Sequence, residues 1–235
     1  MPSIRSWNEA VPSDRELHHA KRRAVLREAA QAFNRRGYHA TTLDALAKRL
    51  GITKAALYHY FPNKNALLKA CFDEVMEAAF SNLAHARANG RNGREKLRMV
   101  FTGYLEDIID ELSVAVVVLE DHALTSDDRE EAFAKRDRFE HSLRELVSEG
   151  ISDGSIVSCD PKLVILTMLG AVNWVPRWFR HNGEWSTQQL AFAMSEVLDR
   201  SISTQPSASL APRVEDINPH DGAGSGGLGR PRKTP

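Results

Sequence analysis

The segment 41–64, TTLDALAKRLGITKAALYHYFPNK, holds the side chains whose types and spacing best suit a chemical role. It predicts two short helices separated by Gly51, because glycine tolerates the backbone angles of a sharp turn. Apolar residues at helical spacing would form the core of this unit, namely Leu46, Leu50, Ile52, Leu57 and Phe61. The second helix would then present Lys54, Ala55, Tyr58 and His59 to the outside. One helix fits the major groove of DNA, where such side chains reach base edges or phosphates.

Capping residues and helix breakers predict the elements that lead into this segment. Apolar residues recur at helical spacing from Ala20 to Arg36, and Gly37 is a typical helix stop. Thr41 and Asp44 have the spacing of a capping box, with Thr41 as the N-cap of the next helix. The first helix is therefore expected over 20–36 and the second from about residue 43.

Three further signals continue the helical pattern beyond Gly51. Thr53 is expected to cap the helix 54–60, Pro62 to end it, and Asn63 to cap a long helix over about 64–88. The run Asn89–Gly93 is a clear break. Later helices are expected over about 94–111, 113–123, 128–150, 160–180 and 186–201. Because no convincing series of strands occurs, the fold class is predicted to be all-α.

Charge is distributed unevenly along a chain of 235 residues whose net charge is zero. Residues 15–64 contain eleven Lys or Arg and three acids, a local charge of +8 that suggests a polyanionic partner. Neither a membrane-spanning run nor a secretory signal is evident, so a cytoplasmic location is expected. The two cysteines, Cys71 and Cys159, are interpreted as reduced and structural.

The stretch from Arg23 to Leu68 resembles the DNA-binding domain of the TetR/AcrR family. The matching signatures are AAQAFNRRGYHATT, ALAKRLGITKAALYHYF and PNKNALL, in the expected order near the N-terminus. The resemblance implies a flexible arm over 1–16, a three-helix helix-turn-helix domain over 17–68, and a larger helical ligand-binding and dimerisation domain over 69–202. Residues 203–235, rich in Ser, Pro and Gly, are predicted to be a disordered tail.

The resemblance also implies which residues contact DNA. Thr42 and Lys64 would bind phosphate, and Lys21 and Arg22 would act as an arm on the backbone or minor groove. The residues assigned to DNA are Lys21, Arg22, Thr42, Thr53, Lys54, Ala55, Tyr58, His59, Tyr60 and Lys64. Plain packing for Tyr58 and Tyr60, and plain solvation for Lys21 and Arg22, are the structural alternatives.

The stretch LGAVNWVPRWFRHNGEWS, residues 169–186, is similar to members of the family that respond to acyl-CoA thioesters from lipid, steroid or aromatic breakdown. Asn173, Arg177 and Arg180 offer amide and guanidinium donors, and arginine can hold phosphate bidentately. Trp174 and Trp178 lie four residues apart on one helix face and could stack on a flat group or line an apolar pocket. Alternatively, the tryptophans pack in a dimer interface with the arginines at its rim. Pro176 lies inside this pattern and is expected to kink the helix.

These features predict a ligand-responsive repressor that binds a palindromic operator as a homodimer and is released by a small-molecule effector. The dimer would form through about 160–180 and 186–201. Alternatives are a regulator of another hydrophobic effector, or an architectural DNA-binding protein without one. No catalytic motif, metal-ligand spacing, cofactor motif in a suitable context or membrane partner is indicated. The ending GRPRK resembles the core of an AT-hook, with a solvated basic tail as the alternative.

Overall fold

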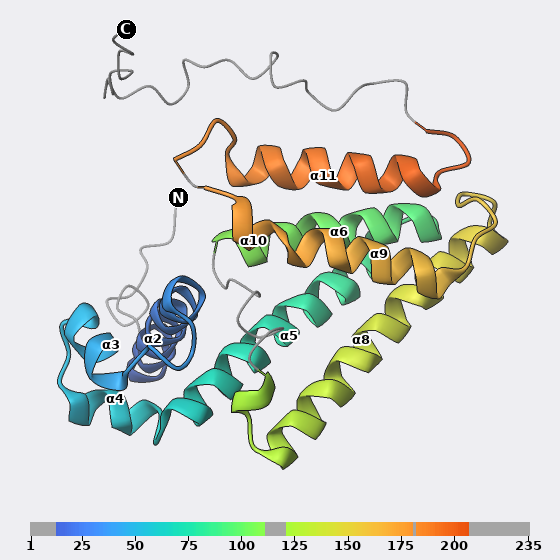
Figure 1. The fold of residues 1–235 in the computed structure, drawn as a ribbon. Helices are drawn as coiled ribbons and strands as arrows, with labels where there is room; N and C mark the ends of the chain where they lie inside the picture. The colour runs from blue at the N-terminus through green and yellow to red at the C-terminus, as the bar shows by residue number, and fades with distance from the viewer. Residues whose placement is uncertain (1–12, 111–120, 181, 207–235) are drawn as a thin grey trace, which may run out of the picture.

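The computed structural model describes residues 13–110, 121–180 and 182–206, and this part of the chain is built from helices (Figure 1). They are α2 (Asp14–Arg36), α3 (Leu43–Leu50), α4 (Lys54–Tyr60), α5 (Lys64–Asn89), α6 (Gly93–Asp110), the 3₁₀ helix η1 (Asp121–Ala123), α8 (Ser126–Ser152), α9 (Pro161–Asn173), α10 (Val175–Trp178) and α11 (Thr187–Ile202). β pairing within these ranges is limited to one isolated bridge, Ile156 to Ser203. The predicted all-α fold is confirmed. The helix expected over 113–123 falls mainly on residues outside the described ranges.

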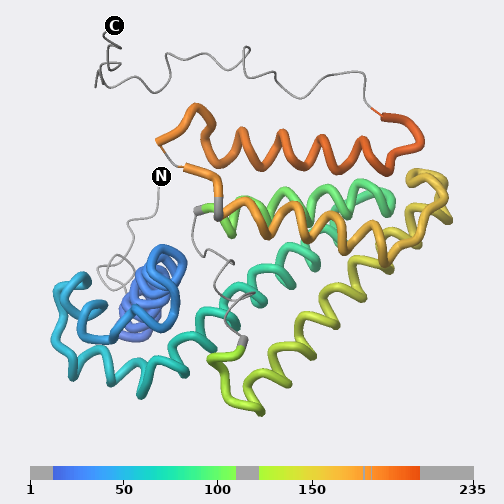
Figure 2. Tube along the Cα trace, in the orientation of Figure 1, coloured from blue at the N-terminus to red at the C-terminus, as the bar shows by residue number. Residues whose placement is uncertain are grey.

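The helices α2, α3 and α4 form an N-terminal unit beside the start of α5 (Figure 2). Its core holds Leu26, Phe33, Leu46, Leu57 and Leu67, each at most 1% exposed. Burial of a large apolar side chain contributes about 1.5–3 kcal/mol, so these residues fix how the short helices pack. Their helical spacing is the pattern from which the unit was predicted.

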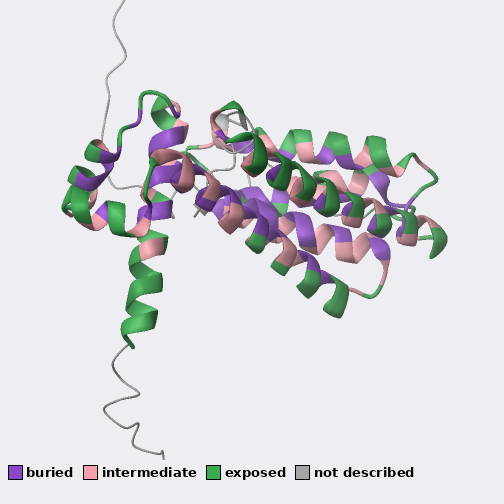
Figure 3. Cartoon of the chain, turned by 90° about the horizontal axis from the view of Figure 1, so that it is seen from below, coloured by how far each residue is buried: buried purple, intermediate pink, exposed green. Residues whose placement is uncertain are grey.

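Helix α2 begins earlier than expected. The Ser13 side chain accepts a hydrogen bond from the backbone N–H of Glu16, and the Glu16 carboxylate accepts one from the backbone N–H of Ser13. This capping box satisfies the first donors of the helix, which therefore starts at Asp14 rather than Ala20. The predicted arm 1–16 is wrong for its last three residues, whereas residues 1–12 lie outside the described ranges. The first turns of α2 are exposed and project from the unit (Figure 3).

The cap of α3 is Thr42 rather than Thr41. The Thr42 hydroxyl oxygen accepts the capping hydrogen bond from a backbone N–H at 3.2 Å. Thr41 is buried instead, and its hydroxyl donates to the carbonyl of Gly37 at 2.9 Å. Because this hydrogen bond uses the Thr41 side chain to close the turn after α2, the capping role passes to the next residue. The capping box predicted for Thr41 and Asp44 does not form, and Asp44 pairs with Lys54.

Helix α5 belongs to both parts of the molecule. Its first half packs against α2 and its second half against α6, while α8 contacts it along its length, from Lys69 and Asp73 to Arg87 (Figures 1 and 2). The expected boundary at residues 68 and 69 therefore lies inside one continuous helix. A displacement of α5 within the C-terminal bundle would be transmitted to the N-terminal unit.

The C-terminal bundle is arranged around α6, which packs against α5, α8 and α11. Gly93 permits a close approach to α8, because a Cβ there would lie 2.2 Å from the backbone nitrogen of Gly150. The Arg94 guanidinium donates to both carboxylate oxygens of Asp199 at 2.7 Å. This bidentate pair fixes the start of α6 to the end of α11.

The helix expected over 160–180 is interrupted. α9 ends at Asn173, and the single turn of α10 contains Pro176. Proline has no backbone N–H and clashes with the preceding turn, so the predicted kink is confirmed. The break separates the last residues of α9 from the two tryptophans that follow.

The C-terminal boundary also differs from the prediction. Ser203 pairs with Ile156, and the Thr204 hydroxyl donates to the carbonyl of Gly154 at 2.8 Å. The expected tail over 203–235 is therefore wrong for residues 203–206, which are fixed by hydrogen bonds to the loop after α8. The remainder, with the GRPRK segment, lies outside the described ranges. Within those ranges, no helix combines the length and hydropathy needed to cross a bilayer.

Candidate DNA-binding face and effector cleft

Helix α4 presents its polar face to the outside, as predicted. Thr53 caps the helix by accepting a hydrogen bond at 3.1 Å, and Leu57 is completely buried beneath it. The exposed residues of α4 include Lys54, Ala55, Tyr58 and His59. Tyr58 is 41% exposed, which argues against the packing alternative for this side chain. Because Leu57 anchors the helix to the core, the exposed side chains project from a fixed base.

Lys54 is positioned by the neighbouring helix. Its ammonium lies 2.8 and 3.1 Å from the two carboxylate oxygens of Asp44 on α3, and 5.8 Å from the ring centroid of Tyr58. The hydrogen bond to Asp44 raises the pKa of Lys54 above its ordinary value, so the side chain keeps its charge. Exposed ion pairs are weak. A DNA phosphate or base edge can therefore compete with Asp44 for this ammonium.

A histidine of α2 reaches the α4 face. The His18 ring lies 4.9 Å from the ring of Tyr60 and 6.4 Å from that of His59, measured between centroids. This contact holds two predicted phosphate-binding side chains against α2. The role of His18 is not evident from the sequence, because its contacts depend on how α2 docks beside α4.

Lys64 makes its contacts inside the protein. Its ammonium donates to the carbonyls of Tyr38 and Thr41 at 2.8 and 3.0 Å, with a longer contact of 3.4 Å to the carbonyl of His39. It also lies 4.1 Å from the ring centroid of Tyr38. An ammonium has three protons, and this loop provides three acceptors. The arrangement fixes the start of α5 to the loop before α3 and differs from the phosphate grip predicted for Lys64.

We expect Lys64→Ala to lower the stability of the protein without changing the salt dependence of DNA binding. Hydrogen bonds to a charged group contribute about 1.5–3 kcal/mol, so the melting temperature should fall by several degrees. Salt titrations of operator affinity provide the second measurement. A salt slope reduced by about one unit at an unchanged melting temperature would instead assign Lys64 to a phosphate. Lys21→Ala is the matched control for the melting temperature, because Lys21 is exposed on α2 and its loss should leave that temperature unchanged.

The remaining residues predicted to contact DNA lie on α2 and at the start of α3. The Arg22 guanidinium lies 3.9 Å from the carboxylate of Glu74 and 5.3 Å from the ring centroid of Phe61. These contacts argue against plain solvation of Arg22, whereas the neighbouring Lys21 is exposed. Thr42 is exposed at the first turn of α3, where it also serves as the cap.

A cleft of about 410 Å³ lies among α5, α8 and α9. Its apolar lining consists of Met76, Phe133, Phe139, Leu166 and Leu169. Gly170 contributes open space, because a Cβ there would meet no atom within 4 Å. Asn173 also lines the cleft and is the predicted ligand residue that the structure places there.

A buried tyrosine fixes the amide of Asn173. The Tyr104 hydroxyl of α6 donates to Asn173 Oδ1 at 3.0 Å. Burial raises the pKa of Tyr104, which is only 7% exposed, so the hydroxyl keeps its proton. Arg136 of α8 also lines the cleft, and its guanidinium lies 5.8 Å from the ring centroid of Phe133. Tyr104 and Arg136 were not predicted from the sequence, because they lie on other helices far from Asn173 in the chain.

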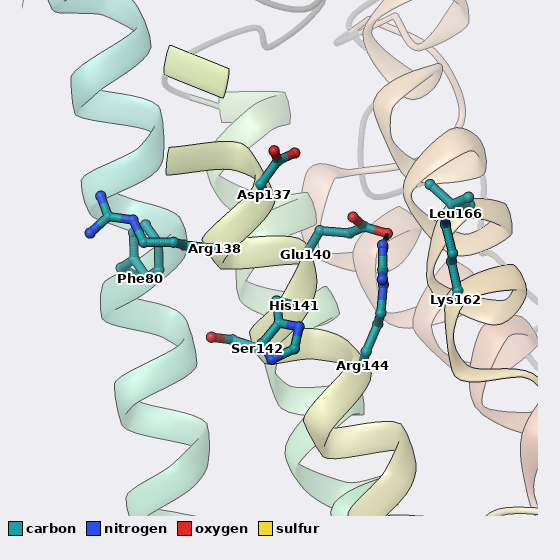
Figure 4. Close-up of a pocket in the computed structure, with 9 residues that line it drawn as sticks. All are labelled: Phe80, Asp137, Arg138, Glu140, His141, Ser142, Arg144, Lys162 and Leu166. Atoms are coloured by element: carbon teal, nitrogen blue, oxygen red, sulfur yellow. Dashed lines mark hydrogen bonds and ion pairs between the residues drawn. The ribbon is translucent and has the colours of Figure 1, made fainter. Parts of the chain in front are cut away.

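A wider, shallower depression of about 950 Å³ adjoins this cleft (Figure 4). The two hollows share Asp137, Glu140 and Leu166 in their linings. Figure 4 shows Glu140 and Arg144 on α8 opposite Lys162 on α9. The charged residues that line the depression are Asp137, Arg138, Glu140, Arg144 and Lys162. An apolar cleft thus opens into a region of mixed charge that contains three cations.

The two tryptophans lie on the surface. Trp174 is 60% exposed and Trp178 is 48% exposed, and neither lines the cleft or the depression. Arg180 is also exposed and donates to the carbonyl of Phe179, and the side chain of Arg177 lies outside the described part of the structure. Of the four predicted ligand residues whose side chains are described, the structure therefore brings Asn173 alone to the cleft. The placement of the tryptophans favours the interface alternative.

An apolar surface extends over α9, α10 and α11. Its exposed large apolar residues are Leu163, Leu166, Trp174, Trp178, Phe192 and Val197. A group of exposed large apolar residues on the same part of a protein is a candidate interaction surface. This surface, which we call the apolar face, coincides with the helices predicted to form the dimer.

Two family models match the chain, one on each part of the fold. The model described as bacterial regulatory proteins, tetR family, matches residues 25–71. The model described as tetracyclin repressor-like, C-terminal domain, matches residues 90–202. The first match covers the helices α3 and α4 with most of α2, and the second covers α6 to α11.

Individual relatives agree with these matches. The uncharacterized HTH-type transcriptional regulator YuxN of Bacillus subtilis is 27% identical over 118 residues, which span 50% of this chain and 40% of YuxN. The HTH-type transcriptional repressor KstR2 of Rhodococcus jostii is 29% identical over 188 residues, 76% of this chain and 90% of KstR2. The crystal structure of AibR in complex with isovaleryl coenzyme A and operator DNA superimposes with a TM-score of 0.64 at 28% identity, covering 75% of this chain and 97% of AibR.

The geometry and the relatives lead to the same assignment. An exposed, capped helix supported by a compact three-helix unit is the arrangement of a helix-turn-helix. The helical C-terminal part matches the second family model over its length. The chain belongs to the TetR family of bacterial regulatory proteins and is a DNA-binding transcription regulator, not an enzyme.

Proposed function

We propose that the protein is a repressor that binds a palindromic operator as a homodimer and is released when a small molecule occupies the cleft among α5, α8 and α9. The observation that carries this proposal is the continuity of α5. Its first residue, Lys64, is held by the loop of the DNA-binding unit, and Met76 on the same helix lines the cleft. An effector that moves α5 thus acts on the DNA-binding unit through one rigid element. The cytoplasm is the expected location.

The apolar face supports the dimer. Residues 160–180 and 186–201 would pair with their copies around a two-fold axis and cover Trp174, Trp178 and Phe192. Two-fold symmetry places two α4 helices on one side of the assembly, so that each enters the major groove of one half-site. Within each DNA-binding unit, Lys54 and Tyr58 would contact base edges or phosphates in the groove. His59, Tyr60 and Lys21 would lie near the flanking phosphates.

An acyl-CoA thioester is the effector that the cleft supports best. The volume of about 410 Å³ is within the range of small-molecule sites, and the lining is mainly apolar, as an acyl group requires. The adjoining depression offers Arg138 and Lys162 to a phosphate-bearing head group, and Arg144 could join them by exchanging its ion pair with Glu140 for a phosphate. The AibR neighbour was crystallised with isovaleryl coenzyme A, and KstR2 is named a transcriptional repressor. A preformed cleft of this kind also favours a regulator over an architectural protein.

Contacts between α5 and the start of α8 provide a route for release. The Asn65 side chain donates to the carbonyl of Ala123 in η1. Lys135 of α8 lies 2.6 Å from Asp73 of α5, and Lys69 of α5 lies 3.1 Å from Glu131 of α8. These contacts fix the first turns of α5 to α8. A ligand that separates the two helices would favour a conformation in which the DNA-binding units no longer fit the operator. The coupling free energy between effector binding and operator binding would be about 1–3 kcal/mol.

The test is a thermal-shift screen of acyl-CoA thioesters and the matching free acids, followed by operator release. The operator is first recovered by selection from random duplexes. We expect a CoA thioester at one hundred times its Kd to stabilise the fold by about 2.7 kcal/mol and to release the DNA. Free acids that act equally well while CoA esters remain inert would refute the acyl-CoA assignment. A chain that binds the operator as a monomer would refute the dimer.

A further inference from the structure

Four polar residues line the cleft, namely Arg136, Asp137, Glu140 and Asn173, and the hydrogen bond made by Asn173 points to one chemical group in the effector. Tyr104 donates to Asn173 Oδ1, which makes that oxygen the acceptor of the pair. The amide of Asn173 then has its NH2 group left to offer to other partners, and an amide nitrogen only donates. Because Asn173 lines the cleft, the hydrogen-bonding group it can provide to a ligand is a donor.

The direction of this hydrogen bond is protected by burial. The Tyr104 ring lies 6.0 Å from that of Phe139 within the core, and burial raises the pKa of the Tyr104 hydroxyl above its ordinary value. The hydroxyl therefore stays protonated and remains able to donate to Asn173. A rotated amide would place an NH2 group against the hydroxyl and turn its oxygen toward the apolar cleft.

We propose that Asn173, oriented by Tyr104, binds a carbonyl oxygen of the effector inside the cleft, with Arg136 as a second donor. This inference rests on the proposed function and assigns the recognition chemistry of the same site. Gly170, one turn before Asn173 on α9, leaves space beside the amide for the atoms that flank the carbonyl. The carbonyl can come from a thioester or from a free carboxylate, and the guanidinium of Arg136 would favour the carboxylate.

The test compares three matched ligands by calorimetry on the purified full-length protein: octanoyl-CoA, S-octyl-CoA, which lacks the carbonyl, and octanoate. We expect the wild type to bind octanoyl-CoA about tenfold more tightly than S-octyl-CoA, since a buried donor would otherwise lose its partner. In Asn173→Leu this preference should fall to about one. Tyr104→Phe should reduce the preference in part, because the amide keeps its place but loses its orientation.

Arg136→Met identifies the source of the carbonyl. If the natural ligand is a thioester, this variant should lose only part of the preference for octanoyl-CoA, because the donor of Asn173 remains. If it is a free carboxylate, the wild type should bind octanoate more tightly than octanoyl-CoA, and Arg136→Met should remove that advantage. Melting curves of each variant check that the fold is retained.

Equal binding of octanoyl-CoA and S-octyl-CoA by the wild type would overturn the inference, and so would an unchanged preference in Asn173→Leu. Failure of all three ligands to bind at millimolar concentration would also overturn it. The proposed function is tested separately by operator release. Ligands that bind with the expected preference but leave the operator occupied would contradict the repressor mechanism and keep the carbonyl site.

Discussion

Phe192→Arg is expected to convert the dimer into monomers and to lower operator affinity by roughly 10²–10⁴-fold, the advantage that linking two binding units provides. Phe192 lies on the apolar face of α11 and is 48% exposed in the single chain. A charge placed there would be buried without a partner in the proposed interface, at a cost of several kcal/mol. In the monomer this position is exposed to solvent, so the arginine should cost little folding stability and the monomer should remain folded.

Sedimentation velocity and operator titration measure the two consequences of Phe192→Arg. Ser148→Arg is the matched control, because Ser148 is exposed on α8 and lies outside the apolar face. It adds the same charge and should leave both the dimer and the operator affinity intact. If Phe192→Arg remained dimeric and bound the operator like the wild type, the interface would have to lie elsewhere on the chain.

The DNA-binding unit could be predicted in detail because its signals are local. The spacing of Leu46, Leu57 and Phe61 defines the core, and Thr53 caps α4 from the adjacent position. The errors in the helix boundaries of this unit are also local, and each concerns which residue caps a helix. Thr41 was predicted to cap α3, but its hydroxyl donates to the carbonyl of Gly37 across the turn after α2.

Lys64 shows a different limit of prediction from sequence, because its contacts come from a distant part of the chain. Its type and its place at the start of a helix suggested a phosphate contact. The structure instead surrounds its ammonium with carbonyls of residues about 25 positions earlier in the chain. A loop that curls back to a helix start leaves no periodic pattern in the sequence, so this role could be found only from coordinates.

The effector cleft was predicted less well because three separate helices form it. Asn173 was found from a short resemblance, but its partner Tyr104 lies 69 residues away on α6. Trp174 and Trp178 belong to the same short motif, yet the break before Pro176 turns them onto the surface. Because the motif was interpreted as one continuous helix, the two surface tryptophans and the cleft residue Asn173 were assigned to a single site.

Gly170→Phe is expected to make the repressor insensitive to its effector while leaving operator binding intact. Gly170 lines the cleft in the last turn of α9, where added atoms enter open space that the ligand would occupy. Competition for that space should cost the ligand about 1–3 kcal/mol, or roughly 5–150-fold in affinity. Operator release at a fixed effector concentration measures the loss.

Gly170→Ala is the control that separates filling the cleft from changing the helix. Alanine replaces a poor helix former with the best one and should stabilise α9 by about 0.5–1 kcal/mol. Its single methyl group leaves most of the cleft open, so the response to effector should persist with a higher melting temperature. If Gly170→Phe were released from the operator at wild-type effector concentrations, the ligand would not bind among α5, α8 and α9. The continuity of α5 would then lose its role as the link between effector and DNA.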